Sequence, residues 1–174
     1  MTLLVNNICH SLRNGPGRRL VIWTQGCYFQ CPGCFNPETH PFDGGQKMDI
    51  ERLAEYINSD GTIDGITLSG GEPLLHTRAL GQLLMLLDPV LTKILYSGFT
   101  IKEIAADPER MDFIRLVDLA IMGRYNQSLE HPYLGKEFMK MTNRVDINYF
   151  KPKFFVEYAM NHMHVTKTGI FKTT

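Results

Sequence analysis

Hydrophobic residues in the middle of this chain repeat at helical spacing. Ile50, Leu53, Ala54 and Ile57 occupy the i, i+3, i+4 and i+7 positions of one face, and Asp49 can cap the first turn. The spacing recurs after residue 76, where a threonine at position 77 is the expected cap of a second helix with leucines at positions 80, 83, 84 and 87. Each helix is therefore expected to pack one face against a sheet.

Short apolar runs alternate with these helical stretches. The runs predict strands at residues 19–23, 65–68, 93–96, 117–122 and 145–149, and two further short helices are predicted at residues 101–106 and 111–116. This alternation indicates an α/β fold with a mostly parallel sheet and right-handed crossovers. Because a full eight-unit barrel needs about 250 residues, the 174 residues of this chain predict an incomplete (β/α) barrel.

Composition limits the classes of function. Eighteen basic and eighteen acidic residues balance, and no charged run is long enough to follow a nucleic acid. No apolar stretch reaches the roughly 18 residues of a membrane span, and the first five residues lack the basic start of a signal peptide. We therefore expect a single cytoplasmic domain that binds neither nucleic acid nor membrane, in a compartment that keeps thiols reduced.

Three of the four cysteines stand close together in the sequence. Cys27, Cys31 and Cys34 are spaced as C-x3-C-x2-C. One short loop with this spacing can give three thiolates to a cubic iron–sulfur cluster and supplies no fourth ligand of its own. The fourth iron would then stay open to a small molecule, which favours a reactive cluster.

Other sites could use the same thiols. A zinc ion would need a further ligand, and Cys9, His10 or His40 could supply it. A redox pair would use Cys31 and Cys34, which stand as C-x-x-C, but it would leave the first cysteine of the triplet without a role. A disulfide framework is typical of small secreted chains with paired cysteines, whereas here three crowd into eight positions.

A second motif follows some forty residues later. Residues 64–73 read D-G-I-T-L-S-G-G-E-P, a short apolar strand that runs into a glycine pair, an acid and a proline. Glycines at the end of a strand allow close backbone approach to a ligand, and the proline stiffens the loop. G-G-E-P alone is a common turn, but its place after a strand and behind a cysteine triplet favours a ligand-binding loop.

Together these motifs resemble the radical S-adenosylmethionine (SAM) superfamily. Within this superfamily, the chain most resembles the activating enzymes of anaerobic ribonucleotide reductase. Further sequence segments occur in the same order as in that family. These are N-G-P-G at residues 14–17, C-P-G-C-F-N at 31–36, S-G-G-E-P at 69–73, Y-S-G-F-T at 96–100 and D-L-A-I-M-G-R-Y at 118–125. The chain departs from the family at M-T-N-R, residues 141–144, where Arg144 replaces a late glutamine.

The resemblance implies two cofactors and a set of contacts. A [4Fe-4S] cluster would bind Cys27, Cys31 and Cys34, and SAM would bind the cluster's open iron. The expected cofactor contacts are Gly33, Cys34, Phe35, Ser69, Gly70, Gly71, Glu72, Ser97 and Asn143. Gly71 is expected to let the backbone approach SAM, and Phe35 to touch adenine. No catalytic side chain beyond the cofactor ligands is expected.

The resemblance also implies an activity and partners. Reductive cleavage of SAM would give a 5′-deoxyadenosyl radical that installs a glycyl radical on a partner resembling anaerobic ribonucleotide reductase. A flavodoxin- or ferredoxin-type protein would donate the electron. Residues 1–149 are expected to form the radical SAM core, and residues 150–174 a C-terminal extension of the same domain. A stand-alone radical SAM enzyme that modifies a peptide or metabolite is the alternative, and a scaffold that only binds is a third reading.

Overall fold

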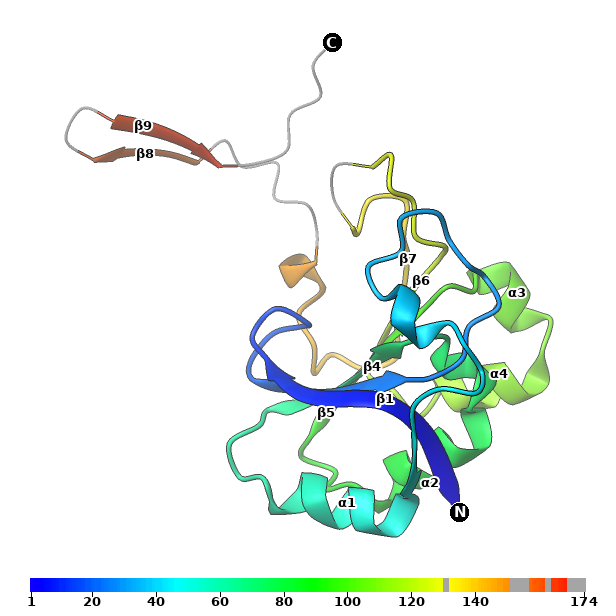
Figure 1. Ribbon diagram of the computed structural model, residues 1–174. Helices are drawn as coiled ribbons and strands as arrows, with labels where there is room; N and C mark the ends of the chain where they lie inside the picture. Colours follow the sequence, from blue (N-terminus) through cyan, green and yellow to red (C-terminus); the bar gives the residue numbers. More distant parts are fainter. Residues whose placement is uncertain (130–131, 151–156, 162–163, 169–174) are drawn as a thin grey trace.

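The structure of the chain is a computed structural model (Figure 1). It describes residues 1–129 and 132–150, together with the backbone of residues 157–161 and 164–168. Most of the expected C-terminal extension lies outside the described residues. Its described strands, β8 (Glu157–Asn161) and β9 (His164–Thr168), pair antiparallel with each other.

Seven strands form one sheet in the order β3-β1-β2-β4-β5-β6-β7. Their bounds are β1 Thr2–Ser11, β2 Arg19–Thr24, β3 Gln46–Asp49, β4 Gly65–Gly70, β5 Thr92–Ser97, β6 Leu119–Met122 and β7 Glu137–Lys140. The four central strands β2, β4, β5 and β6 are parallel neighbours, whereas β1, β3 and β7 join by antiparallel pairing. Strands β3 and β7 are the two edges of this sheet, so the predicted incomplete α/β barrel is confirmed.

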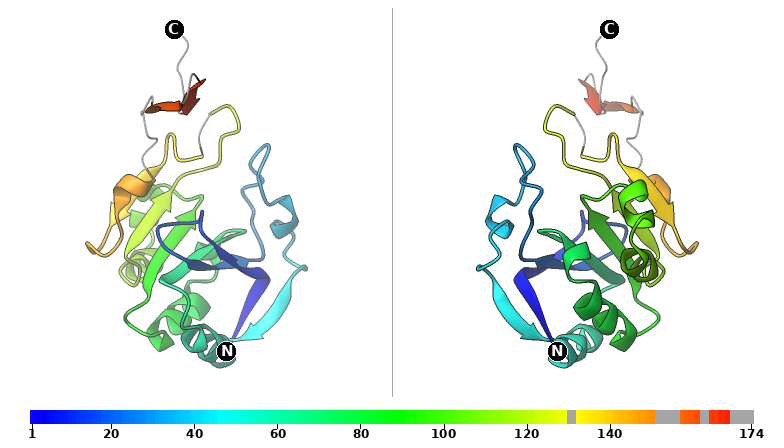
Figure 2. Two further views of the ribbon diagram at one scale, coloured as in Figure 1. Left: turned by 90° about the vertical axis from the view of Figure 1, so that its left-hand side faces the viewer. Right: turned by 90° about the vertical axis from the view of Figure 1, so that its right-hand side faces the viewer.

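The helices connect the parallel strands. Their bounds are α1 Ile50–Ser59, α2 Thr77–Leu86, α3 Ile101–Ala105 and α4 Pro108–Ile114, with short 3-10 turns η1 Pro37–Thr39, η2 Pro73–Leu75 and η3 Ile147–Tyr149. Apolar side chains from all four α-helices share one core with the sheet. Both views of Figure 2 show the loops after β2 and β6 rising at the end of the molecule opposite the N-terminus.

The two helix starts differ in their caps. Asp49 caps α1 as predicted, because its side chain accepts hydrogen bonds from the backbone of Glu51 and Arg52. The expected cap by Thr77 is wrong. His76 occupies the cap position of α2 without a side-chain hydrogen bond, and the Thr77 hydroxyl donates instead to Glu109, near the start of α4.

A smaller apolar cluster fills the other face of the sheet. Its buried members are Ile94, Leu119, Ile121, Val145 and Phe150. The strand predicted at residues 145–149 is wrong, because this segment contains η3. Val145 before this turn and Phe150 after it are buried in the cluster. The last strand of the sheet is instead β7, which runs antiparallel to β6.

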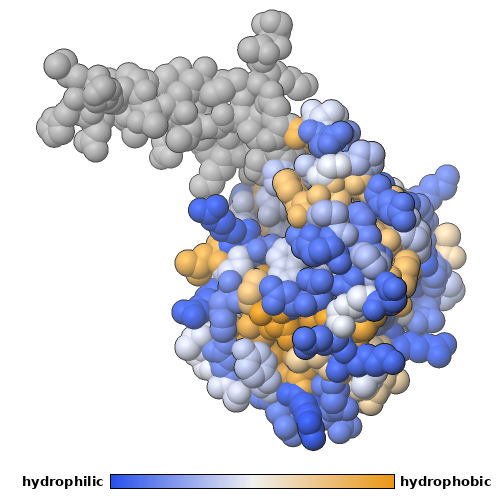
Figure 3. All heavy atoms as spheres, viewed as in Figure 1, coloured by the Kyte–Doolittle hydropathy of each residue, from blue (hydrophilic) through white to orange (hydrophobic). Residues whose placement is uncertain are grey.

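Besides β7, strands β1 and β3 of the sheet were not predicted. The strand expected first in the chain is β2, and β1 precedes it and pairs with it in antiparallel fashion. Strand β3 forms the sheet edge beside β1. On the face seen in Figure 3, hydrophilic side chains surround smaller hydrophobic areas. In the described part of the chain, no helix is long and apolar enough to cross a membrane.

Candidate active site

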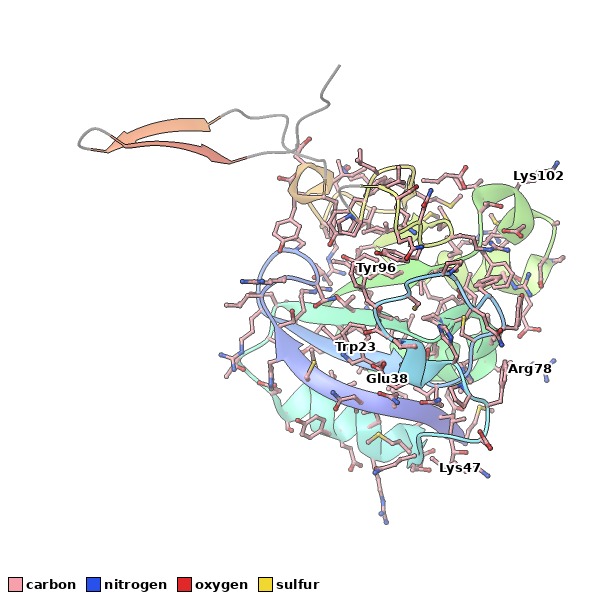
Figure 4. The ribbon with its side chains drawn as sticks, turned by 45° about the horizontal axis from the view of Figure 1, so that its top comes forward. Trp23, Glu38, Lys47, Arg78, Tyr96 and Lys102 are labelled. Carbon is pink, nitrogen blue, oxygen red and sulfur yellow. The ribbon has the colours of Figure 1, made fainter. Side chains whose placement is uncertain are left out.

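The carboxyl ends of the four parallel strands surround one cavity of about 380 Å³. Each strand contributes the loop that follows it, as expected for ligand sites in parallel sheets. Trp23 from β2 and Tyr96 from β5 line the cavity. In Figure 4 both lie within the molecule, whereas the side chains of Lys47, Arg78 and Lys102 extend outward.

The three cysteines of the triplet all line this cavity. They are free thiols, and Cys27 is the most deeply buried, at 7% exposed. Two backbone hydrogen bonds close the base of their loop, from Gly26 to Thr39 (2.8 Å) and from Cys27 to His40 (3.0 Å). A third, from Cys34 to Cys31 (3.1 Å), makes a turn between the last two thiols. One closed loop therefore presents three thiols to one space.

Gln25 fixes the point where the cysteine loop leaves β2. Its side chain is 1% exposed and donates to the backbone carbonyls of Glu38 (3.1 Å) and Pro41 (2.7 Å) on the returning segment. Its amide oxygen accepts from Asn6 (2.8 Å), and its backbone carbonyl contacts the His76 ring (2.8 Å). The side chain holds both ends of the loop together.

Burial and backbone hydrogen bonds act in opposite directions on the Cys27 thiol. Burial raises the pKa of its thiol, while backbone hydrogen bonds from Phe29 and Gln30 lower it. Gln30 has a φ of 46°, a left-handed conformation that bends the loop between Cys27 and Cys31. Backbone amides that point at a sulfur stabilise a thiolate that binds metal.

The zinc alternative depends on how the possible ligand side chains are grouped. Among the described residues, no three His, Cys, Asp or Glu side chains are grouped closely enough to hold a metal ion. Cys9 accepts a hydrogen bond from the Trp23 indole (3.3 Å), and His10 pairs with Asp60. A cubic cluster would place each thiolate on a different iron, and the three thiols line one cavity together with His40, the remaining expected zinc ligand.

The G-G-E-P loop is joined directly to the base of the cysteine loop. Gly71 donates to the carbonyl of Thr24 (2.8 Å), and Glu72 donates to that of Gly26 (2.9 Å). Gly70 has a φ of 104°, and a Cβ there would overlap the backbone of Thr24. A Cβ on Gly71 would overlap the carbonyl oxygen of Gly26 and lie 2.9 Å from its carbon. Gly70 and Gly71 therefore allow the G-G-E-P loop to pack directly against the base of the cysteine loop. This role is separate from the expected approach of Gly71 to SAM.

The Glu72 side chain links the G-G-E-P loop to the end of β5. It is 1% exposed, and its carboxylate accepts from the backbone of Leu74 (2.9 Å), the hydroxyl of Ser97 (2.9 Å) and the backbone of Gly98 (2.7 Å). Burial raises its pKa to about 7, although these three hydrogen bonds oppose the shift. Both carboxylate oxygens thus hold loops in place.

Aromatic and cationic side chains support the cysteine loop from outside. The Phe29 ring packs edge-to-face on Phe99 (4.9 Å between centroids), and the Arg124 guanidinium lies 3.7 Å from the centre of Phe29. Two nitrogens of Arg124 donate to Glu103 on α3 at 2.7 Å each. Arg110 from α4 lies over Phe99 at 3.9 Å. The loop therefore rests on α3, α4 and the loop after β6.

Comparison with known proteins places the chain. The family described as "4Fe-4S single cluster domain" matches residues 13–144. The chain belongs to this family. The anaerobic ribonucleoside-triphosphate reductase-activating protein of Vibrio cholerae is 30% identical over 142 residues, which cover 76% of this chain and 88% of the relative. The protein of the same name from Escherichia coli K12 is 30% identical over 131 residues, 70% of this chain and 83% of the relative.

Two more distant similarities were found. The pyruvate formate-lyase-activating enzyme of Clostridium pasteurianum is 38% identical over 82 residues, 43% of this chain and 34% of that enzyme. The crystal structure of QueE from Escherichia coli aligns with 57% of this chain and 54% of its own, at 18% identity and a TM-score of 0.46. The family match and the activating-protein relatives confirm the predicted membership among radical SAM activating enzymes, and with it an enzymatic role.

Most of the contact residues expected in this 4Fe-4S family member lie at the cavity. The expected residues that line it are Cys34, Phe35, Ser69, Gly70, Gly71, Glu72 and Ser97. Phe35 is 68% exposed and contacts Tyr125 at 4.6 Å between ring centroids, which places it at the rim.

Two expected contacts do not line the cavity. Gly33 packs against the side chain of Gln127 with a φ of 67°, so it shapes the cysteine loop from outside the cavity. Asn143 is exposed and follows Met141, whose backbone donates to Asp118 just before β6. Asn143 therefore lies at the amino end of the strands, opposite the cavity.

Several residues of the site were not found from the sequence. Gln25 lies in the T-Q-G-C segment, but a glutamine is neither a typical metal ligand nor a catalytic group, so the sequence did not indicate its role. Arg124 and Lys136 reach the site through contacts between distant segments, and Trp23 lines the cavity from the end of β2. Only the position of Trp23, the last residue of a predicted strand that leads into the cysteine loop, could have indicated its place.

The buried Glu72 predicts a pH dependence of stability in the cluster-free 4Fe-4S protein. Its pKa rises from 4.5 to about 7 on folding, so between these values the unfolded chain loses the proton and the folded chain keeps it. Stability should therefore fall as pH rises from 4.5 to 7, by at most about 3 kcal/mol. Urea unfolding followed by circular dichroism measures this slope, and Glu72→Gln should flatten it. Parallel stability curves for the two proteins between pH 5 and 8 would contradict the prediction.

Proposed function

We propose that this chain binds a [4Fe-4S] cluster through Cys27, Cys31 and Cys34 and uses it to cleave SAM reductively. When bound and reduced, the cluster would supply the one electron that breaks the S–C5′ bond of SAM, and the resulting 5′-deoxyadenosyl radical would take a hydrogen atom from a glycine of a partner enzyme. The partner would be a glycyl-radical enzyme resembling anaerobic ribonucleotide reductase.

One observation carries this proposal. The three thiols and the G-G-E-P loop face one cavity, and the backbones of Gly71 and Glu72 are hydrogen-bonded to the base of the cysteine loop. A cluster and a molecule bound at its open iron would thus be held by two loops in fixed relation. Such fixed geometry is what a reaction between a metal centre and a bound molecule requires.

The residues at the cavity divide into ligands and positioning groups. The three thiols would bind iron, and Ser69, Gly70 and Ser97, which line the cavity, would contact SAM. Glu72 holds its loop, because its carboxylate oxygens already accept hydrogen bonds from three groups. Phe35 at the rim can cover the adenine, while Tyr96 and Ile121 form part of the wall.

The partner would reach the cavity from the rim. The rings of Phe35 and Tyr125 stand there, and Tyr28 in the cysteine loop is 50% exposed. A flavodoxin- or ferredoxin-type donor would supply the electron in a cytoplasmic setting, and no nucleic acid or membrane would take part. Residues 150–174 would extend the core of residues 1–149 and could contact the partner.

The test pairs two readouts on one anaerobic preparation. The chain is reconstituted with iron and sulfide, reduced with dithionite, and mixed with SAM and a glycyl-radical reductase from the same organism. We expect 5′-deoxyadenosine release together with a glycyl-radical signal in electron paramagnetic resonance, and no signal when the reductase lacks its glycine. Zinc uptake without iron would sink the proposal. Cleavage of SAM without a radical on any such partner would favour the stand-alone modifying enzyme.

A further inference from the structure

Lys136 is a half-buried cation in the wall of the cavity. It precedes β7, and its ammonium donates hydrogen bonds to the backbone carbonyls of Gly123 and Arg124, the latter at 2.8 Å. An ammonium has three N–H donors, and these two bonds fix its position. The side chain therefore spans the loop between β6 and β7 and holds a charge at the cavity.

Lys136 differs from the other cation on this side of the site. The Arg124 guanidinium is neutralised by Glu103 through two hydrogen bonds of 2.7 Å. The ion pairs among the described residues do not include Lys136. Both bonds described for its ammonium go to neutral carbonyls, so Lys136 adds a full positive charge to the cavity wall.

Cys31 and Glu72, two groups that can carry negative charge, line the same cavity as Lys136. Burial lowers the pKa of Lys136, and the charges of Cys31 and Glu72 raise it. A half-buried ammonium without a carboxylate partner costs free energy unless negative charge lies nearby. A cluster ligated at Cys31 would provide that charge.

We propose that Lys136 raises the reduction potential of the cluster held by Cys27, Cys31 and Cys34, an inference that rests on the proposed function. Three thiolates make the bound cluster negative, and the electron it accepts adds one more negative charge. A fixed cation stabilises the reduced form more than the oxidised form. The electron comes from the reductant, no bond forms or breaks at Lys136, and its proton stays in place.

The experiment measures the potential of the cluster without SAM. Lys136→Met keeps an unbranched stem and removes the charge, whereas Lys136→Arg keeps the charge. A unit charge about 10 Å from a redox centre, at an effective dielectric constant of about 20, changes the ratio of reduced to oxidised centre roughly tenfold. We therefore expect the midpoint potential of Lys136→Met to fall by about 59 mV, and that of Lys136→Arg to change by less than about a third of this.

A control on the same strand excludes a general effect of charge. Lys140 is exposed at the other end of β7, where it pairs with Leu119 at the amino end of β6. Lys140→Met removes the same charge far from the cavity and should leave the midpoint unchanged. The titration follows the reduced cluster by electron paramagnetic resonance, after iron and sulfide contents have been matched. If Lys136→Met loses the cluster, Lys136→Gln, which keeps a hydrogen-bond donor, carries the same comparison.

Three results would overturn the inference. Equal midpoints in Lys136→Met and Lys140→Met would show that the charge is not sensed by the cluster. Weakened SAM binding at an unchanged midpoint would assign Lys136 to SAM instead. An unsubstituted chain that takes up no cluster would overturn both this role and the proposed function, so the two failures are distinguishable.

Discussion

Alanine at any one of Cys27, Cys31 and Cys34 is expected to reduce SAM cleavage to the level of a protein-free control. Each thiolate would bind a different iron, so no neighbouring side chain can replace it. Most of the fold should persist, because the cysteine loop is also held by Gln25 and by Phe29 packed on Phe99. Release of 5′-deoxyadenosine and the iron content per chain are the quantities to measure.

Cys9→Ala is the matched control. Cys9 accepts a hydrogen bond from Trp23 and does not line the cavity. Its loss should cost about 1 kcal/mol of stability and leave both iron content and cleavage intact. Equal activity in Cys34→Ala and Cys9→Ala would show that the triplet does not hold the cluster.

Valine at Gly71 is expected to remove the cluster and SAM binding together. The new side chain would overlap the Gly26 carbonyl and push the two loops apart. The hydrogen bonds from Gly71 to Thr24 and from Glu72 to Gly26 would then be lost. We expect a loss of about 3 kcal/mol in the free energy of unfolding. Iron analysis and calorimetric titration with SAM would follow the loss at the site.

Gly61→Val provides the comparison for this substitution. Gly61 lies in the turn before β4, and a Cβ there meets no atom within 4 Å. The variant should lose less than about 1 kcal/mol and keep normal iron and SAM binding. A Gly71→Val protein that bound the cluster normally and lost only SAM would mean that Gly71 serves ligand approach alone, as its motif suggested.

The parallel strands were readable from the sequence because both of their faces are buried. Runs such as that of Leu20 to Ile22 have apolar side chains on each side of the sheet. Strand β1 was missed because its apolar pattern is interrupted at Asn6 and Asn7, where the pairing with β2 shifts register between Val5 and Asn7. Strand β3 is a polar edge with no periodicity to detect.

The wrong strand at residues 145–149 has a different cause. The sequence V-D-I-N-Y alternates apolar and polar residues, as a half-buried strand does. In the structure Asp146 accepts a hydrogen bond from the backbone of Asn148 (2.9 Å), so its side chain starts a 3-10 turn. The alternation of apolar and polar residues here therefore belongs to a capping residue followed by a turn. The sequence pattern alone does not distinguish this arrangement from a strand.

The parts of the site that could be predicted are those whose residues lie close together in the sequence. The cysteine triplet and the G-G-E-P loop are local patterns, and each thiol and glycine of these loops that was expected at the cavity lines it, apart from Gly33. Lys136 lines the same cavity as Cys31, although it stands more than a hundred positions further along the chain. Contacts of that kind depend on which strands become neighbours in the sheet. The local pattern of a single sequence does not predict the order of the strands.

The indole of Trp23 has a practical consequence for work on this protein. Trp23 is the chain's single tryptophan, it lines the cavity, and its indole N–H donates a hydrogen bond to the sulfur of Cys9. Iron–sulfur clusters absorb light at the wavelengths that tryptophan emits, so a cluster assembled in the cavity would quench this one fluorophore by energy transfer. The native chain thus contains an optical probe of cluster assembly and decay that needs no label, and Cys9 offers a place to tune its emission without touching the cluster ligands.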